Sequence, residues 1–337
     1  MRIGILGWYG HANAGDERIL AALRRIFAGH ALEVVGELHL TDASLAALNR
    51  CDFVLFGGGG LLLRGNGVYA PGFARITAPL GVIGISVEAV HADNQALIDV
   101  LRAKAAFIHV RDAESARVFA GVPRLLSGVD LTFYDPYDVV PPTAEPVAGV
   151  NLRPWRYWRA EHGGAMDHFL RRVDTRLPAL RRAYPFPKWV PERVIDALRA
   201  QALTRRPLPF YEEPGEATDA DALAPFFPDV PPFDATDMDR CRLVVGMRLH
   251  ALIFACQKGI PFVSLTYQPK NAVFCTAAGV PELSTDLFHP AAFTAALTRV
   301  QADYAAVRAR LLAYRGHAVA QMRADAGLLR RWMGCDR

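Results

Sequence analysis

The chain has few lysines, few cysteines and no long hydrophobic run, and each scarcity excludes a class of protein. Only four of its 38 cationic residues are lysine, so a single lysine carries more weight here than a single arginine. The five cysteines are scattered without a CxxC pair, which argues against a zinc cage or a disulfide framework and favours a reducing compartment. Every apolar stretch is interrupted before about 18 residues, so no transmembrane helix is predicted.

An export signal, a strong charge imbalance and the usual metal motifs are also missing. The opening residues, MRIGILGWYG, lack the apolar core and cleavage site of a signal peptide. A net charge of +4 over 337 residues is too dilute to predict nucleic-acid binding. HExxH, GxSxG and carboxylate-rich metal loops do not occur. We therefore expect a cytoplasmic protein without a bound metal or redox cofactor and without a nucleic-acid partner.

The composition and the strand pattern predict a folded α/β protein of about two domains. Hydrophobic residues make up 52% of the chain and charged residues 21%, which lies in the globular range. In the first half, short apolar runs end in glycine or polar residues and are followed by helical patterns, as is typical of a parallel sheet. These runs are Ile3–Leu6, Leu32–Val35, Phe53–Phe56, Val82–Ile85 and Ala106–Val110.

The second half repeats this pattern after a connector that is rich in proline and acids, Asp135–Pro146. Its predicted strands are Val147–Leu152, Leu208–Tyr211, Leu243–Gly246 and Pro261–Leu265, with one or two long helices in Pro290–Met333. We expect two Rossmann-like, doubly wound domains, residues 1–140 and residues 147–337. Because ligands bind at the carboxyl ends of such sheets, the two domains are expected to face a cleft.

Two glycine-containing segments follow predicted strands of the first domain. Asn13, Gly15, Asp16 and Glu17 lie where a strand passes into a helix, a location that suits an anion or a polar sugar. Alternatively, Asn13 turns the chain and Asp16 caps the helix. The run Gly57–Gly60 either allows a ligand to approach the backbone or forms a tight turn.

The strongest signal is the segment Leu243–Cys256, a buried strand that leads into a helix that is apolar nearly all round. Arg248 and His250 lie at the start of this helix, where a guanidinium, an imidazole and free backbone N–H groups together suit an anion. A histidine there can also transfer a proton. The alternative is a core histidine that a neighbouring carbonyl satisfies.

Further cations follow the other strands of the second domain. Tyr267 and Lys270 come after Pro261–Leu265, and Arg153 comes after Val147–Leu152. Lys270 either joins Arg248 or is a solvated turn residue. The basic and aromatic run Arg153–Arg159 fits a sugar-binding cleft wall, a single-stranded nucleic-acid platform, a membrane-facing surface or plain packing. Arg111 and Asp112, after the strand ending at Val110, are expected to be a surface arginine and a helix cap.

Taken in order, these segments resemble the polysaccharide pyruvyl transferase family. The resemblance rests on Asn13-x-Gly15-Asp16-Glu17, Gly57–Gly60, Val110-Arg111-Asp112, Leu152-Arg153, Gly246-Met247-Arg248-Leu249-His250 and Tyr267-x-Pro269-Lys270. It implies a GT-B-like pair of Rossmann-like domains, phosphoenolpyruvate as donor and a sugar of a cell-surface glycan or its precursor as acceptor. It also implies that Arg153, Arg248 and His250 occupy donor-site and catalytic positions.

The chemistry of phosphoenolpyruvate suits these residue types. Its carboxylate and phosphate need at least two cationic groups, which Arg153 and Arg248 could supply, with Lys270 as a third. Catalytic roles are expected for His250, Arg248 and Asp16. The donor side is expected to comprise Arg153, Arg248, Lys270 and Tyr267. The acceptor side is expected to comprise Asn13, Gly15, Glu17, Gly58 and Gly59 of the first domain.

Two other functions remain open at this point. The first is a nucleotide-sugar glycosyltransferase, since the same cations would hold a diphosphate. The second is a non-catalytic sugar- or anion-binding protein. The acceptor could be a free, lipid-linked or nucleotide-linked glycan, and a homo-oligomer is a further expectation. Contact with the inner face of a membrane is a weaker hypothesis, based on Arg156, Trp158 and Arg159 and on Arg308, Arg310, Arg315, Arg323, Arg330 and Arg331.

Overall fold

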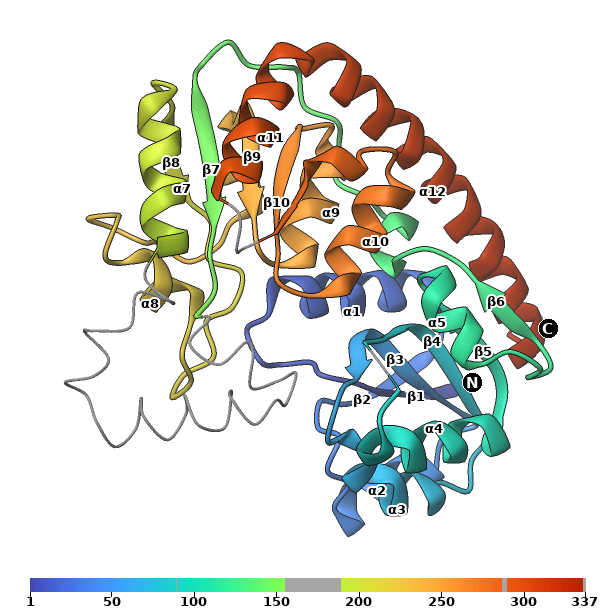
Figure 1. Cartoon of the computed structure of the whole chain (residues 1–337). Coiled ribbons are helices and arrows are strands. Elements are labelled where there is room, and N and C mark those ends of the chain that lie inside the picture. The colour runs from blue at the N-terminus through green and yellow to red at the C-terminus, as the bar shows by residue number, and fades with distance from the viewer. Residues whose placement is uncertain (89, 155–188, 287–289, 336–337) are drawn as a thin grey trace. The chain divides into compact units, whose positions relative to one another are not determined.

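The protein forms two compact units, each built around one parallel sheet (Figure 1). The computed structural model describes residues 1–88, 90–154, 189–286 and 290–335. Unit 1 comprises Met1–Tyr137 and Ala313–Arg337, and unit 2 comprises Asp138–Leu312. The division falls inside the proline-rich connector. The predicted α/β class with two Rossmann-like parts is confirmed.

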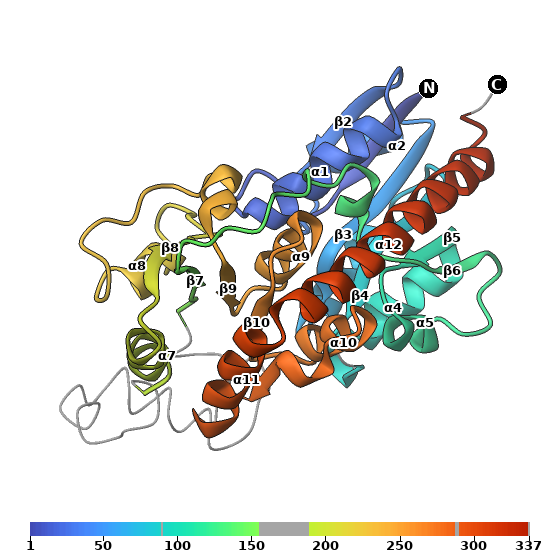
Figure 2. The ribbon, with the colours of Figure 1, turned by 90° about the horizontal axis from the view of Figure 1, so that it is seen from above.

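The sheet of unit 1 has the order β2-β1-β3-β4-β5-β6, and all of its pairings are parallel. Figure 2 shows β3, β4, β5 and β6 in this succession. The strands are β1 (Arg2–Leu6), β2 (Ala31–Val35), β3 (Phe53–Leu62), β4 (Leu80–Val87), β5 (Ala105–Val110) and β6 (Leu125–Ser127). The chain winds outward in both directions from β1 and β3, so the strand order reverses between these two strands.

Helices cover both faces of this sheet, which is why its strands are almost continuously apolar. Helix α1 lies on one face, and α2, α3 and α4 lie on the other (Figure 1). Side chains alternate along each strand, so Leu6 and Phe56 pack beneath α2 and α3, while Ile5 and Leu55 occupy the opposite positions. The helices are α1 (Ala14–Ile26), α2 (Asp42–Asn49), α3 (Ala70–Ala74), α4 (Ala92–Lys104) and α5 (Ala113–Val118), with 3₁₀ turns at Asn66–Tyr69 and Leu131–Tyr134.

The four glycines Gly57–Gly60 lie inside β3, not in a loop after it as the sequence suggested. A Cβ atom on Gly57 would lie 1.9 Å from the carbonyl oxygen of Ile83 on β4. At Gly58, where φ is +85°, it would lie 2.5 Å from both the Tyr9 hydroxyl and the Ile19 side chain. The Tyr9 hydroxyl itself donates a hydrogen bond to the Gly57 carbonyl. These glycines therefore make room for the protein's own packing.

Unit 2 contains a parallel sheet of order β11-β10-β9-β7-β8. Its strands are β7 (Val147–Asn151), β8 (Thr204–Pro207), β9 (Leu243–Gly246), β10 (Phe262–Thr266) and β11 (Ser284–Asp286). The strand predicted at Leu208–Tyr211 is wrong, because β8 ends at Pro207, just before that segment. The Leu208 N–H donates to the Val150 carbonyl of β7. The Phe210 N–H donates to the Asp219 side chain, so the chain no longer pairs with β7 at this point.

Helices connect the strands of unit 2 and continue to the C-terminus. They are α7 (Trp189–Ala200), α8 (Asp219–Leu223), α9 (Leu249–Lys258), α10 (Pro269–Ala277), α11 (Pro290–Ala302) and α12 (Tyr304–Met333), with 3₁₀ turns at Ala235–Arg240 and Pro281–Leu283. Helices α11 and α12 confirm the long helices predicted in the last part of the chain. Residues 155–188, which precede α7, lie outside the described residues.

The assignment of the whole C-terminus to the second domain needs correction, because α12 passes from unit 2 into unit 1 at Leu312. Figure 2 shows α12 as one continuous helix. In its last part, the Asp325 carboxylate lies 3.4 Å from Nε2 of the buried His109, and the ring of Trp332 lies 5.8 Å from that of Phe107. These contacts with β5 bury the end of the helix in unit 1.

Several of the C-terminal arginines named in the membrane hypothesis bind groups of this chain. Arg308 donates to the carbonyls of Gly259 and Val140, and Arg310 pairs with Glu282. Arg315 and Arg330 donate to the carbonyls of Tyr137 and Ile26. In the described parts of the chain, no helix combines the length and the hydropathy needed to span a membrane.

Two glycines with the same backbone angle should separate steric packing from backbone strain. Gly58 and Gly65 have φ of +85° and +86°, but no atom lies within 4 Å of a Cβ built on Gly65. We expect Gly65→Ala to cost about 1 kcal/mol of unfolding free energy, the penalty of the left-handed conformation. Gly58→Ala should cost about 1–3 kcal/mol more because it overpacks Tyr9 and Ile19. Equal denaturation midpoints for the two variants would contradict this account.

Candidate functional site

The predicted polar residues of unit 2 lie at the carboxyl edge of its sheet, where the strand order reverses between β7 and β9. Arg153 follows β7, Arg248 follows β9 and Tyr267 follows β10. Crossover connections leave in opposite directions from such a switch point, which opens a crevice that commonly holds the ligand. This edge is therefore the candidate ligand site of unit 2.

Arg248 is the N-cap residue of α9, as the sequence predicted. Every residue of α9 from Leu249 to Lys258 is buried, which explains the nearly uniform apolar sequence of this helix. The first backbone N–H groups of the helix have no partner within it, and the helix dipole places partial positive charge at this end. An interior helix that begins at the sheet edge therefore presents positive potential there, and Arg248 adds a full charge.

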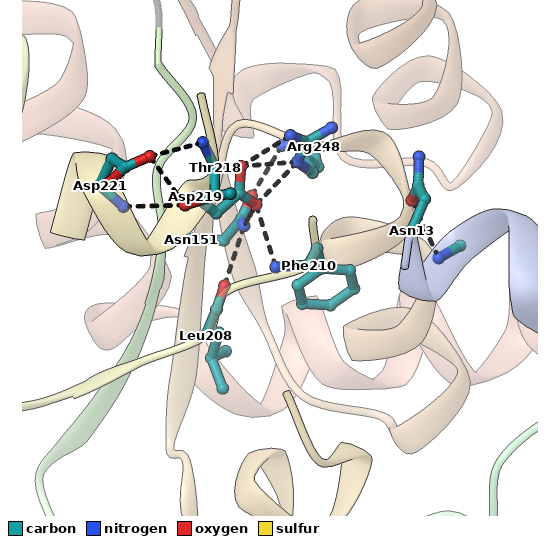
Figure 3. A network of polar contacts seen from close by, with 9 residues as sticks. Asn13, Asn151, Leu208, Phe210, Thr218, Asp219, Asp221 and Arg248 are labelled. Carbon is teal, nitrogen blue, oxygen red and sulfur yellow. Dashed lines mark hydrogen bonds and ion pairs between the residues drawn. The ribbon is translucent and has the colours of Figure 1, made fainter. Parts of the chain in front are cut away.

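The side chain of Arg248 is held by Asp219, which the sequence analysis missed (Figure 3). Nε donates to both carboxylate oxygens of Asp219 at 2.9 and 2.7 Å, and Nη2 donates to Oδ1 at 2.7 Å. Asp219 has no exposure to solvent, and the Arg248 side chain is 15% exposed. Because the pair is shielded from water, the carboxylate fixes the orientation of the guanidinium.

Asn151, the last residue of β7, ties the same pair to the sheet. Its Oδ1 accepts the backbone N–H of Arg248 at 2.9 Å, and its Nδ2 donates to Asp219 Oδ2 at 3.0 Å (Figure 3). The Leu208 carbonyl accepts a second bond from Nδ2. One buried amide thus joins both the backbone and the counter-ion of Arg248 to the strand at the switch point.

Asp219 reaches this position because it begins α8 after a loop that returns to the sheet. Its Oδ2 accepts the Phe210 N–H at 3.0 Å, and its own N–H donates to the Tyr211 carbonyl at 3.0 Å. Thr218 and Asp221 form a capping box that starts the helix. The sequence signalled only a helix cap here, because an aspartate at a helix start is common whether or not it pairs with a distant arginine.

Tyr267 lies between the other two predicted cations. The Arg153 guanidinium carbon lies 4.8 Å from the centroid of the Tyr267 ring, and Lys270 Nζ lies 5.8 Å from it. Tyr267 is 6% exposed. Arg153, Arg248, Tyr267 and Lys270 are therefore brought together, as the sequence predicted for the ends of adjacent parallel strands.

Two tyrosines contact the arginines of this site, and their ionisation is affected in opposite directions. Burial alone would raise the pKa of Tyr267, but the charges of Lys270, Arg153 and Arg248 and a hydrogen bond from Arg153 lower it below the ordinary tyrosine value. The Tyr211 ring lies 4.9 Å from the Arg248 guanidinium carbon. Burial, reinforced by Glu216 and Glu213, raises the pKa of Tyr211 to about 12. Cations therefore dominate the charge around Tyr267, whereas burial and two glutamates dominate at Tyr211.

Helix α10 is anchored to the same edge. Asn271 is fully buried and donates from Nδ2 to the Met247 carbonyl at 2.7 Å, which joins the first turn of α10 to the end of β9. Lys270, its neighbour in that turn, is partly exposed. The interpretation of Lys270 as an isolated solvated turn residue is therefore not supported, since it lies over the ring of Tyr267.

His250 occupies the first turn of α9, two residues after Arg248. It is 9% exposed, and its ring lies 5.8 Å from the ring of Phe254 one turn further along. This position places an imidazole in the first turn of α9, beside the positive helix start. The sequence therefore placed His250 correctly, and its catalytic role is a proposal.

The predicted residues of unit 1 surround the start of α1. Asn13 caps this helix by accepting the Gly15 N–H at 3.2 Å, and the Glu17 side chain accepts the Gly10 N–H at 2.6 Å. These two bonds hold the loop after β1, and the cap of α1 is Asn13, not Asp16 as the structural alternative had it. Asp16 is buried, with 8% exposure. A Cβ on Gly59 would lie 2.7 Å from its Oδ1.

The expected contact of Gly58 and Gly59 with an acceptor stays a prediction, and the structure shows what occupies the space beside these glycines. The space that a side chain would take is filled by Tyr9 and Ile19 at Gly58 and by Asp16 at Gly59. Burial and the nearby Asp16 and Glu17 raise the pKa of Tyr9 well above its ordinary value, so its hydroxyl stays protonated on the Gly57 carbonyl. The glycine run therefore serves packing at the β1–β3 switch point.

The expectation of a surface arginine after β5 is also wrong. Arg111 is 5% exposed and pairs with the equally buried Asp130 at 2.9 Å. Asp112 caps α5 by accepting the Ser115 N–H at 2.7 Å, as expected. The arginine is buried because Asp130, which the sequence did not connect with it, neutralises its charge.

Two further predictions concern other parts of the chain. Trp155, Arg156, Trp158 and Arg159, proposed for a sugar, nucleic acid or membrane, lie outside the described residues. Within the described ranges, no group of three or more His, Cys, Asp or Glu side chains could hold a metal ion.

Comparisons with known proteins agree with the architecture. A family profile described as polysaccharide pyruvyl transferase matches residues 13–269. No curated protein matches the chain. UDP-GlcNAc 2-epimerase from Neisseria meningitidis, bound to UDP-GlcNAc, has a TM-score of 0.51 at 10% identity over 99% of each chain. A Listeria monocytogenes protein described as a UDP-N-acetylglucosamine 2-epimerase has a TM-score of 0.51 at 12% identity over 92% of this chain and 90% of that one. At these identities the likeness shows the fold alone, which is GT-B-like.

Removing the partner of Arg248 should be far more costly than removing a neighbouring cap. We expect Asp219→Ala to lose about 3–5 kcal/mol of unfolding free energy, because it leaves a largely buried guanidinium without its counter-ion. Asp221→Ala, two residues away and exposed, should lose about 1 kcal/mol. Chemical denaturation of both variants tests this, and a loss at Asp219 no larger than that at Asp221 would contradict the role of the pair.

Proposed function

This chain belongs to the polysaccharide pyruvyl transferase family, and we propose that it transfers the pyruvyl group of phosphoenolpyruvate to two hydroxyls of one sugar. The product is a cyclic ketal, and phosphate is released. The observation that carries the proposal is the cluster of Arg153, Arg248 and Lys270 at the switch point of unit 2, with His250 in the same helix turn as Arg248.

The distribution of N–H donors suits a ligand with two anionic groups. Arg248 uses Nε and one N–H of Nη2 for Asp219, which, within the described residues, leaves the N–H groups of Nη1 for a donor carboxylate or phosphate. Arg153 and Lys270 provide charge around Tyr267 for the second group. Phosphoenolpyruvate carries a carboxylate and a phosphate ester on the same carbon, so one small ligand offers an anionic group to each set.

The reaction requires proton transfer at three oxygen atoms, those of the two acceptor hydroxyls and of the leaving phosphate, and at one carbon atom. A proton must be added to the methylene carbon of the donor, and the attacking hydroxyl must lose one. An imidazole accepts and returns protons near neutral pH, so we assign His250 this exchange with the acceptor hydroxyls. Arg248 stabilises the negative charge that develops on the leaving phosphate.

The acceptor side is proposed for unit 1, with Asp16 as its main polar group. Asn13 and Glu17 already bind the backbone of the loop after β1, so their role is to hold that loop in shape. Asp16 would accept hydrogen bonds from sugar hydroxyls as a carboxylate. The acceptor is proposed to be a sugar of a cell-surface glycan or of its lipid-linked or nucleotide-linked precursor, modified in the cytoplasm.

The likeness to UDP-GlcNAc 2-epimerases supports one alternative, a nucleotide-sugar enzyme. The Neisseria meningitidis protein binds UDP-GlcNAc on the same type of fold. The helix starts and cations of unit 2 would also hold a diphosphate. The family match favours the pyruvyl donor, and the identity of the stabilising ligand separates the two functions.

Ligand-induced thermal stabilisation tests the donor directly, since a ligand that binds only the native state raises the melting temperature. We expect phosphoenolpyruvate to stabilise the protein more than inorganic phosphate, UDP, GDP, CMP or NAD does. Lys270→Met should weaken its binding by about tenfold because a charge-assisted bond is lost while the aliphatic stem is kept. Stabilisation by a nucleotide and not by phosphoenolpyruvate would favour the nucleotide-sugar enzyme.

The role of His250 is tested by turnover in an acceptor screen that measures phosphate release. We expect His250→Ala to lower kcat about 10²–10⁴-fold, the usual contribution of a general acid or base, while stabilisation by phosphoenolpyruvate persists. His39→Ala, at an exposed position of unit 1, is the matched control and should keep full activity. Full activity of His250→Ala would refute the catalytic assignment.

A further inference from the structure

Tyr267 is a buried phenol at the edge where the proposed donor binds. It follows β10 directly and precedes the first turn of α10, so its place is set by the sheet and not by a long loop. Only 6% of the residue is exposed. An aromatic residue at such a place would ordinarily be explained by packing, and the charges around it indicate something more.

The charged groups that act most strongly on Tyr267 are three cations, and they come from three different elements. Arg153 approaches from the end of β7 and donates a hydrogen bond, Arg248 acts from the start of α9, and Lys270 acts from α10. The carboxylate of Asp219 is engaged by Arg248 through Nε and Nη2. A negative charge on the Tyr267 oxygen would therefore be stabilised from several sides.

Tyr211 provides an internal contrast in the same unit. It also lies against Arg248, but Glu216 and Glu213 act on it and burial dominates, which raises its pKa to about 12. The pKa of Tyr267 is lowered despite its burial. Contact with an arginine does not by itself make a tyrosine acidic, and the difference between the two residues arises from the number and sign of the surrounding charges.

The proposed reaction requires more proton transfer than one imidazole performs in a single step. In the first half, a carbon gains a proton while a hydroxyl loses one, so an acid and a base are needed at the same time. An acid is effective when its conjugate base is stabilised, and the surroundings of Tyr267 stabilise a phenolate.

We propose that Tyr267 is the acid that protonates the methylene carbon of phosphoenolpyruvate, with His250 as the base for the attacking hydroxyl; this rests on the proposed function. The electron pair of the C=C bond forms the new C–H bond with the phenolic proton. The hydroxyl oxygen bonds to the central carbon and gives its proton to His250. A phosphorylated tetrahedral intermediate results, with Tyr267 as phenolate and His250 as imidazolium.

The second half of the reaction returns Tyr267 and His250 to their starting protonation states. The bond between the central carbon and the phosphate oxygen breaks, the electron pair leaves with the phosphate, and His250 gives its proton to that phosphate. The second hydroxyl bonds to the same carbon and returns its proton to Tyr267. Of the two hydroxyl protons consumed, one equivalent ends on the methyl group and one on phosphate, so the enzyme is unchanged.

Tyr267→Phe removes the phenolic proton and keeps the ring that contacts Arg153 and Lys270. We expect kcat to fall about 10²–10⁴-fold while the affinity for phosphoenolpyruvate stays within about threefold. The alkaline limb of the kcat–pH profile, where the acid loses its proton, should also disappear from the residual activity, and the acidic limb that reports His250 should remain. Unchanged kcat in Tyr267→Phe would overturn the proposal.

Tyr304→Phe is the matched control for activity, because Tyr304 contacts an arginine outside the site. Its ring lies 4.5 Å from the Arg242 guanidinium carbon. This variant should retain kcat and both limbs of the pH profile, and an equal loss in it would also overturn the proposal. Wild-type protein without phosphoenolpyruvate turnover would refute the proposed function itself, whereas active wild type with active Tyr267→Phe would refute this inference alone.

Tyrosinate absorbance gives a readout that does not depend on turnover. We expect the first tyrosine to ionise on alkaline titration of the ligand-free protein to be missing in Tyr267→Phe and present in Tyr211→Phe. Inorganic phosphate should delay this ionisation, because a bound anion offsets the cations that favour the phenolate. Identical titrations of wild type and Tyr267→Phe would overturn the acidic character assigned to Tyr267.

Discussion

Asp219 carries a carboxylate with no exposure to solvent, and the arrangement of the site in unit 2 depends on its pairing with Arg248. Each charge alone would be costly to bury, but the two share three N–H···O contacts. Asn151 connects this pair to β7 and holds the backbone of Arg248 at the start of α9. Strand, helix and charge are therefore coupled, so that displacing any one of them disturbs the others.

This pairing also decides which cations face a ligand with their full charge. Arg248 is partly compensated before any ligand arrives, and its free N–H groups serve mainly to direct an anion. Two further cations, Lys270 and Arg153, lie against the ring of Tyr267. The site thus contains a rigidly held hydrogen-bond donor, Arg248, and a separate region of positive charge at Lys270 and Arg153. This arrangement suits a ligand with two different anionic groups.

The sequence predicted the site of unit 2 better than that of unit 1. Arg248 and Lys270 could be found because buried parallel strands end at one edge, so residues after neighbouring strands must meet. The glycines of β3 were expected after the strand and lie within it, because glycine permits close approach of any group and Tyr9 is the group that approaches Gly57 and Gly58. Asp219 was missed because its partner lies 29 residues away in sequence and nothing local marks an ion pair.

By itself, the sequence determined the α/β class, the parallel strands and the helix on which Arg248 and His250 lie. Hydrophobic periodicity, and the glycine, proline and polar residues that end strands and helices, are local properties of the sequence. Only the tertiary structure decided the counter-ion of Arg248, the different surroundings of Tyr267 and Tyr211, and the unit to which the end of α12 belongs. Those features arise from contacts between distant segments in a shielded interior, where the energy of a charge depends on every neighbour and not on its own residue type.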